Sequence, residues 1–136
     1  MEFIQDNLLL VIAAAASGAM LLWSIMSDRV SGISQLGTLE ATRLINEDAL
    51  VLDVREDKEW TAGHIPNARH IPLGALSSRL GELEKFKSKP IVVSCRSGHR
   101  SGRACAMLKK SGFENVHNLA GGIIAWEKAS LPITTK

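Results

Sequence analysis

The stretch IVVSCRSGHRS, residues 91–101, carries the most informative pattern in the chain. It begins with a short β-branched run that follows Pro90, and this pattern predicts a buried strand. The run ends at Cys95, after which small and cationic residues lead into a predicted helix over residues 102–110. A cysteine between a strand and a helix N-terminus lies where backbone N–H groups favour a thiolate. The stretch therefore predicts a reactive thiol at Cys95.

The residues after Cys95 are suited to binding an anion. Ser97 and Gly98 are small and allow successive N–H groups to converge, while Arg96 and Arg100 add positive charge. These features stabilise a thiolate over a thiol, so we expect the pKa of Cys95 to be low. The predicted substrate-binding residues around the catalytic Cys95 are Arg96, Ser97, Gly98, His99, Arg100 and Ser101.

An ordinary explanation competes with this one, because a single cysteine at the end of a strand is often a small, inert core residue. The two guanidinium groups close to Cys95 in the sequence argue against a purely apolar site. The second cysteine, Cys105, has alanines on both sides. We expect it to be a half-buried helix residue. The alternative is a resolving cysteine that forms a disulfide with Cys95.

Short apolar runs alternate with helix-like segments, which predicts an α/β fold with a parallel sheet flanked by helices. Thr38 is expected to cap the first helix of this domain. The expected strands are residues 49–54, 68–71, 91–94 and 115–119, and the later helices are residues 56–62, 76–86, 102–110 and 123–128.

Ligands of parallel sheets bind beyond the carboxyl ends of the strands. Asp53 and Arg55 end one expected strand and Cys95 ends another, so we expect all three to face one site. Asp53 is expected to hold loop amides, and Arg55 to pair with Glu56 or Glu59, in support of the site. Purely structural roles for Asp53 and Arg55 are the alternative.

The segment from Leu8 to Met26, LLLVIAAAASGAMLLWSIM, contains no charged residue over 19 positions. An α-helix needs about 20 residues to cross a bilayer, so we predict one transmembrane helix over residues 8–27. A cleaved signal peptide fits less well, because the preceding flank carries Glu2 and Asp6 and no basic residue. A buried soluble helix of this length would be unusually apolar on all sides.

Basic residues near this segment predict its orientation. Arg29 follows the segment and no basic residue precedes it. The positive-inside rule therefore places the N-terminus outside the cell (inner) membrane and the C-terminal domain in the cytoplasm. Small residues four positions apart, Ala13 with Ser17 and Ala14 with Gly18, would let two such helices form a homodimer. Apolar residues without that role are the alternative.

The composition excludes several classes of protein. The 136 residues include 16 Lys+Arg and 14 Asp+Glu, and this mild positive charge does not predict nucleic-acid binding. The two cysteines form no CxxC pair and no Cys/His cluster. Neither a structural zinc site nor a disulfide framework is therefore expected.

Four motifs, in this order, resemble those of the rhodanese family of sulfurtransferases, and the resemblance extends over about residues 33–130. They are LDVRE at residues 52–56, GHIPNARHIP at 63–72, CRSGHRS at 95–101 and LAGGI at 119–123. With its N-terminal helix, the chain is similar to a membrane-anchored rhodanese of one domain. The predicted organisation is an N-terminal flank at residues 1–7, the transmembrane helix at 8–27, a linker at 28–36, the rhodanese domain at 37–131 and a tail at 132–136.

The resemblance implies a reaction. Cys95 attacks the outer sulfur of a donor such as thiosulfate, releases sulfite and passes the sulfur from a persulfide to a thiol or cyanide acceptor. By position, Arg100 binds the anionic donor, and the backbone of residues 97–101 holds the persulfide. No metal or organic cofactor is needed. The expected partners are a small anionic sulfur donor, an acceptor thiol or sulfur-accepting protein, and the lipid bilayer.

Two other functions compete with this expectation. The first is a binding module, in which the rhodanese fold holds a partner protein at the membrane without catalysis. The second is a phosphatase or an arsenate reductase on the same fold. Protein tyrosine phosphatases place an arginine six positions after the cysteine, but this chain has Ser101 there and Arg100 one position earlier. The shorter spacing favours sulfur chemistry.

Overall fold

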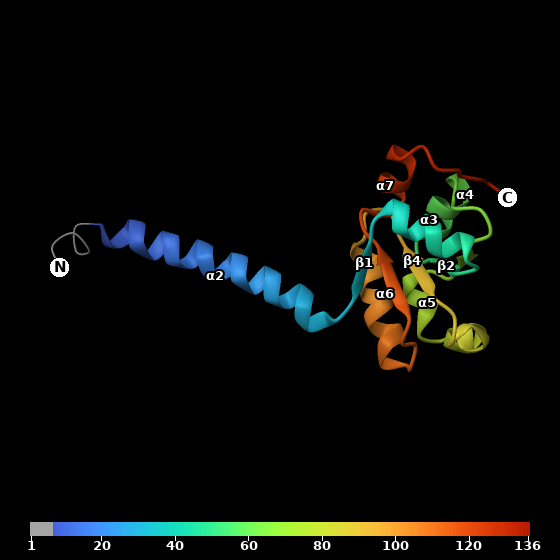
Figure 1. Cartoon of the computed structure of the whole chain (residues 1–136), viewed down its shortest axis with the longest axis horizontal. Coiled ribbons are helices and arrows are strands. Elements are labelled where there is room, and N and C mark those ends of the chain that lie inside the picture. Colours follow the sequence, from blue (N-terminus) through green and yellow to red (C-terminus); the bar gives the residue numbers. More distant parts are fainter. Residues whose placement is uncertain (1–6) are drawn as a thin grey trace. The chain divides into compact units, whose positions relative to one another are not determined.

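A computed structural model of the chain describes residues 7–136, except for the side chains of residues 24–31. The chain divides into two compact units, Met1–Gly32 and Ile33–Lys136. Five strands and most of the helices lie in the second unit (Figure 1).

The described part of the first unit is a single long helix, α2 (Leu8–Ser31). Its apolar side chains are exposed from Leu8 to Trp23. Among the described residues, no helix is long and apolar enough to cross a membrane. The predicted transmembrane helix is therefore not found there, and the side chains at its last positions, 24–27, lie outside the described residues.

Part of the segment predicted as a linker, residues 28–36, has regular secondary structure. Helix α2 continues to Ser31, and strand β1 (Ser34–Leu36) follows after a short turn. Strand β1 pairs in parallel with the last strand of the sheet, where Gln35 lies opposite Asn118. So short a strand, with only one fully buried residue, is held by this pairing and has no apolar run that would reveal it in the sequence.

The second unit contains a parallel five-stranded sheet with the order β1-β5-β4-β2-β3. The predicted parallel α/β fold is thus confirmed. Strand β4 lies at the centre of this order, and every one of its side chains is buried because both faces of the sheet are covered. The other strands are β2 (Leu50–Asp53), β3 (Arg69–His70), β4 (Ile91–Ser94) and β5 (Val116–Leu119).

The helices follow the expected alternation with two local corrections. Gly37, not Thr38, occupies the N-cap of the first helix of this unit, and glycine has no side chain that could cap it. The predicted helix over residues 76–86 is instead a short helix that ends at Leu76, a turn, and a 3₁₀ segment. The elements are α3 (Thr38–Asn46), α4 (Asp57–Ala62), α5 (Leu73–Leu76), η1 (Leu80–Phe86), α6 (His99–Lys110) and α7 (Gly122–Lys128).

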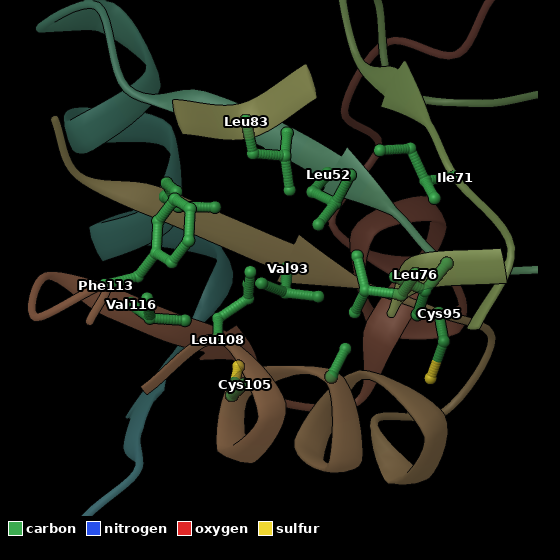
Figure 2. Packing of buried hydrophobic residues seen from close by; sticks show 13 residues of the cluster. Leu52, Ile71, Leu76, Leu83, Val93, Cys95, Cys105, Leu108, Phe113 and Val116 are labelled. Carbon is green, nitrogen blue, oxygen red and sulfur yellow. The ribbon is translucent and has the colours of Figure 1, made fainter. Parts of the chain in front are cut away.

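Two apolar clusters cover the two faces of the sheet. Successive side chains of β4 point to opposite faces, so Val93 joins one cluster and Val92 the other. The first cluster packs under α5, η1 and α6 and includes both cysteines (Figure 2). The second packs under α3 and α7 and includes Trp126. The carboxyl ends of the strands therefore emerge between two packed layers.

The carboxyl edge of the sheet brings together the two strand ends that the sequence singled out. Asp53 at the end of β2 lies in register with Ser94 at the end of β4. Cys95 is the next residue, so the Asp53–Arg55 segment and the Cys95 loop share one edge. This part of the prediction is confirmed.

Candidate active site

Cys95 begins the loop that connects β4 to α6. The helix starts at His99, three residues earlier than predicted, and Gly98 occupies its N-cap with φ of 106°. This left-handed conformation suits glycine and turns the Gly98 N–H toward the cysteine. The Gly98 N–H donates to Cys95 Sγ at 3.1 Å. The N-terminus of α6 thus reaches the sulfur, where its partial positive charge favours an anion.

The start of α7 closes the loop from the other side. The N–H of Ile123 donates to the Cys95 carbonyl oxygen at 2.9 Å, and the N–H of Ile124 donates to the Arg96 carbonyl oxygen at 3.2 Å. A Cβ at Gly122 would overlap the Cys95 carbonyl oxygen, and Gly122 has φ of 57°. Glycine is required at Gly122 because two backbones touch there, whereas a Cβ at Gly121 would overlap the Ala125 side chain.

Burial and hydrogen bonds act in opposite directions on the pKa of Cys95. Burial of the side chain, which is 1% exposed, raises the pKa because it disfavours the charged form. The Ser101 hydroxyl and the backbone N–H groups of Ser101, Gly98 and Ser97 lower it. The hydrogen bonds outweigh burial, so the pKa of Cys95 lies below its ordinary value. The expected low pKa is thereby supported.

Ser101 links Cys95 to a buried residue that the sequence analysis did not single out. Its hydroxyl lies 3.3 Å from Cys95 Sγ and also contacts Asn118 Oδ1. Asn118, on β5, donates through Nδ2 to the Gly98 carbonyl oxygen at 3.0 Å and to Gln35 Oε1 at 3.1 Å. The available signal was an asparagine near the carboxyl end of a short strand, where an apolar residue is expected.

Arg100 is not free for a donor in this structure. Its two terminal nitrogens form a bidentate ion pair with the Glu59 carboxylate at 2.6 and 2.8 Å. The hydrogen bond from Arg100 lowers the pKa of Glu59 to about 2 although burial opposes it. Glu59 likewise raises the pKa of Arg100. From the sequence, Glu59 was expected only as a possible partner of Arg55. Its contact with Arg100 could not be predicted from a local pattern, because 41 residues separate the two in the chain.

Helix α4, which carries Glu59, is held in place by local contacts. Glu56 and Glu59 form a capping box at its start. The Trp60 ring stacks on the His64 ring at 3.5 Å between centroids and on the His70 ring at 4.7 Å. These contacts position the Glu59 carboxylate toward the cysteine loop.

The remaining predicted loop residues lie at the mouth of the site. Arg96, Ser97 and His99 are exposed, and Gly98 is half-buried. The described structure thus brings Ser97, Gly98 and Ser101 to the sulfur through their hydrogen bonds. Arg96 and His99 contribute cationic or polar groups at the surface instead.

Asp53 and Arg55 form a buried ion pair, at 2.8 Å, with side chains that are 1% and 6% exposed. Arg55 also donates to the Gly63 carbonyl oxygen at 2.7 Å, and Asp53 Oδ1 accepts the Arg55 N–H. The predicted pairing of Arg55 with Glu56 or Glu59 is wrong. Asp53 is the partner because the chain bends at Arg55, two residues after β2 ends. The pair ties the end of β2 to the turn at Gly63 and so supports the edge where Cys95 lies.

Cys105 has surroundings unlike those of Cys95. It is fully buried in the apolar cluster rather than half-buried, and both cysteines are free. Burial raises the pKa of Cys105 to about 12. It lies six residues after His99, the first residue of α6, which places it about 9 Å from His99 along the helix axis. Figure 2 shows the two sulfur atoms well apart. This favours the structural interpretation of Cys105 over a disulfide with Cys95.

Comparisons with known proteins agree with the geometry. The profile of the rhodanese-like domain matches residues 38–129. A sulfurtransferase of Allochromatium vinosum is 44% identical over 87 residues, which cover 64% of this chain and 79% of that protein. The uncharacterized protein YibN of Escherichia coli K12 is 34% identical over 135 residues, covering 98% of this chain and 94% of that protein.

A solved structure extends the comparison to three dimensions. The crystal structure of a rhodanese-related protein from Thermoplasma volcanium matches with a TM-score of 0.70 and 30% identity, covering 76% of this chain and 99% of that one. The fold and the cysteine loop define a rhodanese-like α/β domain. The chain belongs to the rhodanese family. Relatives described as sulfurtransferases or as a sulfur carrier support sulfur-transfer activity in general.

Proposed function

We propose that this protein transfers sulfane sulfur from an anionic donor such as thiosulfate, through a persulfide on Cys95, to a thiol or cyanide acceptor. The observation that carries the proposal is the convergence of hydrogen-bond donors from Ser97, Gly98 and Ser101 on one buried sulfur. These donors stabilise an anion on sulfur without a neighbouring base. The same donors suit the terminal sulfur of a persulfide, which is also anionic.

The reaction has two displacement steps. The Cys95 thiolate attacks the outer sulfur of thiosulfate, a sulfur–sulfur bond forms on Cys95, and the donor's sulfur–sulfur bond breaks to release sulfite with its electron pair. An acceptor thiolate then attacks the terminal sulfur of the persulfide. The Cys95 thiolate leaves and is ready for the next cycle. Sulfur and charge balance in each step, and no external oxidant or reductant is consumed.

The donor would meet two kinds of cation at the site. Arg96 is exposed in the residue after Cys95 and would add positive charge for an approaching anion. Arg100 would bind the donor in exchange for, or in addition to, its ion pair with Glu59. Two oxygens of such a donor would accept hydrogen bonds from the Arg100 guanidinium, as the two carboxylate oxygens of Glu59 do here.

Intact-mass spectrometry of the purified protein after thiosulfate treatment tests the proposal. We expect the mass to increase by one sulfur atom, and a subsequent thiol or cyanide to remove it. Cys95→Ser is expected to abolish the gain, whereas the matched variant Cys105→Ala is expected to retain it. Absence of a sulfur adduct with thiosulfate and also with a persulfide-forming cysteine desulfurase would contradict the proposal and favour a noncatalytic binding module.

We propose further that the N-terminal helix attaches the domain to the cell membrane, with the domain on the cytoplasmic side. The support comes from the sequence from Leu8 to Met26, which has no charge, and from Arg29 beyond it. The exposed apolar side chains of Leu9, Met20 and Trp23 would then contact lipid. A homodimer through the small residues of this helix is compatible with the same arrangement.

Fractionation of cells that produce the full chain tests the attachment. We expect the protein in the membrane pellet after alkaline carbonate washing and in the supernatant only after detergent. A protease added from outside the cytoplasm should leave the domain intact. Release by carbonate would overturn the attachment, and digestion from outside would overturn the orientation.

A further inference from the structure

The Ser101 hydroxyl lies between two acceptors but has one proton to donate. Ser101 is fully buried, and its Oγ contacts both Cys95 Sγ and Asn118 Oδ1. A hydroxyl donates one hydrogen bond and accepts others through its lone pairs. The state of the sulfur therefore decides which neighbour receives the proton.

The orientation of the Asn118 amide is determined by its other contacts. Asn118 Nδ2 lies 3.0 Å from the Gly98 carbonyl oxygen, which can only accept a hydrogen bond. The amino end of the side chain must therefore face Gly98, and the carbonyl end must face Ser101. Oδ1 has no proton, so the short contact with Ser101 requires Ser101 to be the donor.

The same hydroxyl has a different best partner in each ionisation state of Cys95. With a neutral thiol, Ser101 donates to Asn118, and its lone pair can accept the Cys95 S–H. With a thiolate or a persulfide anion, Ser101 has two acceptors beside it. The charged sulfur then takes the proton, because hydrogen bonds to an ionised acceptor are roughly twice as strong. Asn118 Oδ1, on a side chain that is buried, loses its donor in that state.

We propose that Asn118 is a positioning residue that holds the Ser101 proton away from the resting thiol and thereby sets the pH at which Cys95 ionises. When sulfur becomes anionic, the hydroxyl turns from Asn118 to the sulfur. The inference deepens the proposed function, on which it rests, because it concerns the anion that the sulfur-transfer reaction uses. Asn118 opposes ionisation, whereas Ser101 supports it, although both belong to one hydrogen-bonded chain.

The other charged groups near Cys95 keep their partners in the variants that test this proposal, whereas the Gly98 carbonyl oxygen loses a donor when the Asn118 amide is removed. On α6, the charge of Arg100 interacts with Cys95, and Arg100 is paired with Glu59 of α4, while Cys105 is replaced by alanine throughout the test. On β2, the Asp53 carboxylate is held by Arg55. Helix α7 contributes backbone N–H groups through Ile123 and Ile124. Apart from the Gly98 carbonyl oxygen, none of these groups depends on the Asn118 side chain.

The test is the pH dependence of Cys95 alkylation by iodoacetamide, measured by intact mass in a Cys105→Ala background without any sulfur donor. Asn118→Leu removes the competing acceptor, so the pH midpoint is expected to fall by about one unit. Ser101→Ala is expected to raise the midpoint. Asn118→Asp, which strengthens the competing acceptor and adds negative charge, is also expected to raise it.

Gln35→Ala is the matched control, because it removes the outer partner of the Asn118 amide and leaves Oδ1 in place. We expect its midpoint to equal that of the parent protein. If the circular dichroism of Asn118→Leu shows that it does not fold, Asn118→Ala replaces it in the test. Its pH midpoint of alkylation is then expected to fall in the same way. A midpoint that rises or stays unchanged when the acceptor is removed overturns the inference. The proposed function fails separately, by the absence of a sulfur adduct.

Discussion

The two cysteines lie in one apolar cluster, but their pKa values shift in opposite directions. Cys95 and Cys105 are both buried and belong to the same cluster. The pKa of Cys95 is lowered, while burial raises that of Cys105 to about 12. Burial alone would raise both. The difference arises because Cys95 lies at a strand end, where backbone N–H groups point at its sulfur, whereas the backbone around Cys105 is inside a helix.

The strongest test of this difference compares the alkylation rates of the two thiols at pH 7. A pKa of about 12 leaves on the order of one part in 100,000 of Cys105 as thiolate, while Cys95 exceeds about one part in 100. We expect iodoacetamide to modify Cys95 at least about 1,000-fold faster. Peptide mapping of the native protein over time gives both rates. Comparable rates at the two sites would contradict the comparison.

Gly122→Ala is expected to raise the pKa of Cys95 and so to bring it closer to that of Cys105. The new Cβ would overlap the Cys95 carbonyl oxygen, and the positive φ of Gly122 disfavours alanine. We expect a loss of about 3 kcal/mol in the free energy of unfolding and a rise in the pKa of Cys95. Denaturant unfolding and the pH midpoint of alkylation measure the two effects.

Gly81→Ala is the control for that substitution, because no atom lies within 4 Å of a Cβ there. We expect its unfolding free energy to stay within about 0.5 kcal/mol of the parent value. If the unfolding free energy of Gly122→Ala also stays within about 0.5 kcal/mol of the parent value, the close approach of α7 does not stabilise the cysteine loop.

Cys105→Ala tests whether the second cysteine is only a core residue. Removal of one buried sulfur should cost about 1 kcal/mol of unfolding free energy. The rate of sulfur loading on Cys95 should stay the same, because Cys105 has no part in the reaction. Urea unfolding and intact-mass time courses give the two quantities. A change in loading rate beyond twofold would assign Cys105 a role that its burial argues against.

Glu59→Gln is expected to have the smallest effect, a decrease in the free energy of unfolding through loss of the ion pair with Arg100. The pKa of Glu59 is about 2, below its ordinary value of 4.5. Its ion pair with Arg100 therefore stabilises the fold above about pH 4.5, and this contribution is lost as the pH falls towards 2. Both side chains reach solvent, so the contribution at pH 7 is below about 1 kcal/mol.

Urea unfolding of the parent and Glu59→Gln between pH 7 and pH 3 measures this contribution. The two proteins should converge in stability as the pH falls, and added salt should narrow their difference at pH 7. A difference that grows as the pH falls would show that the ion pair is not its source.

Much of the fold was accessible from the sequence because its signals are local. The β-branched run at residues 91–94 predicted the central strand with its correct bounds, and the glycine after residue 62 marked the end of α4. Strand β1 was missed, since three residues held by pairing with β5 carry no pattern of their own. The split of residues 76–86 was missed because helical spacing does not distinguish an α-helix from a 3₁₀ segment.

By itself, the sequence determined the chemistry that is available: a cysteine at the end of a buried strand, small residues that let N–H groups converge, and arginines that add positive charge. Tertiary structure alone decided the partners. It assigned Arg100 to Glu59, Arg55 to Asp53, and Ser101 to Asn118. Which donor meets which acceptor depends on how β2, α4 and β5 meet at one sheet edge, and no local pattern encodes those distances.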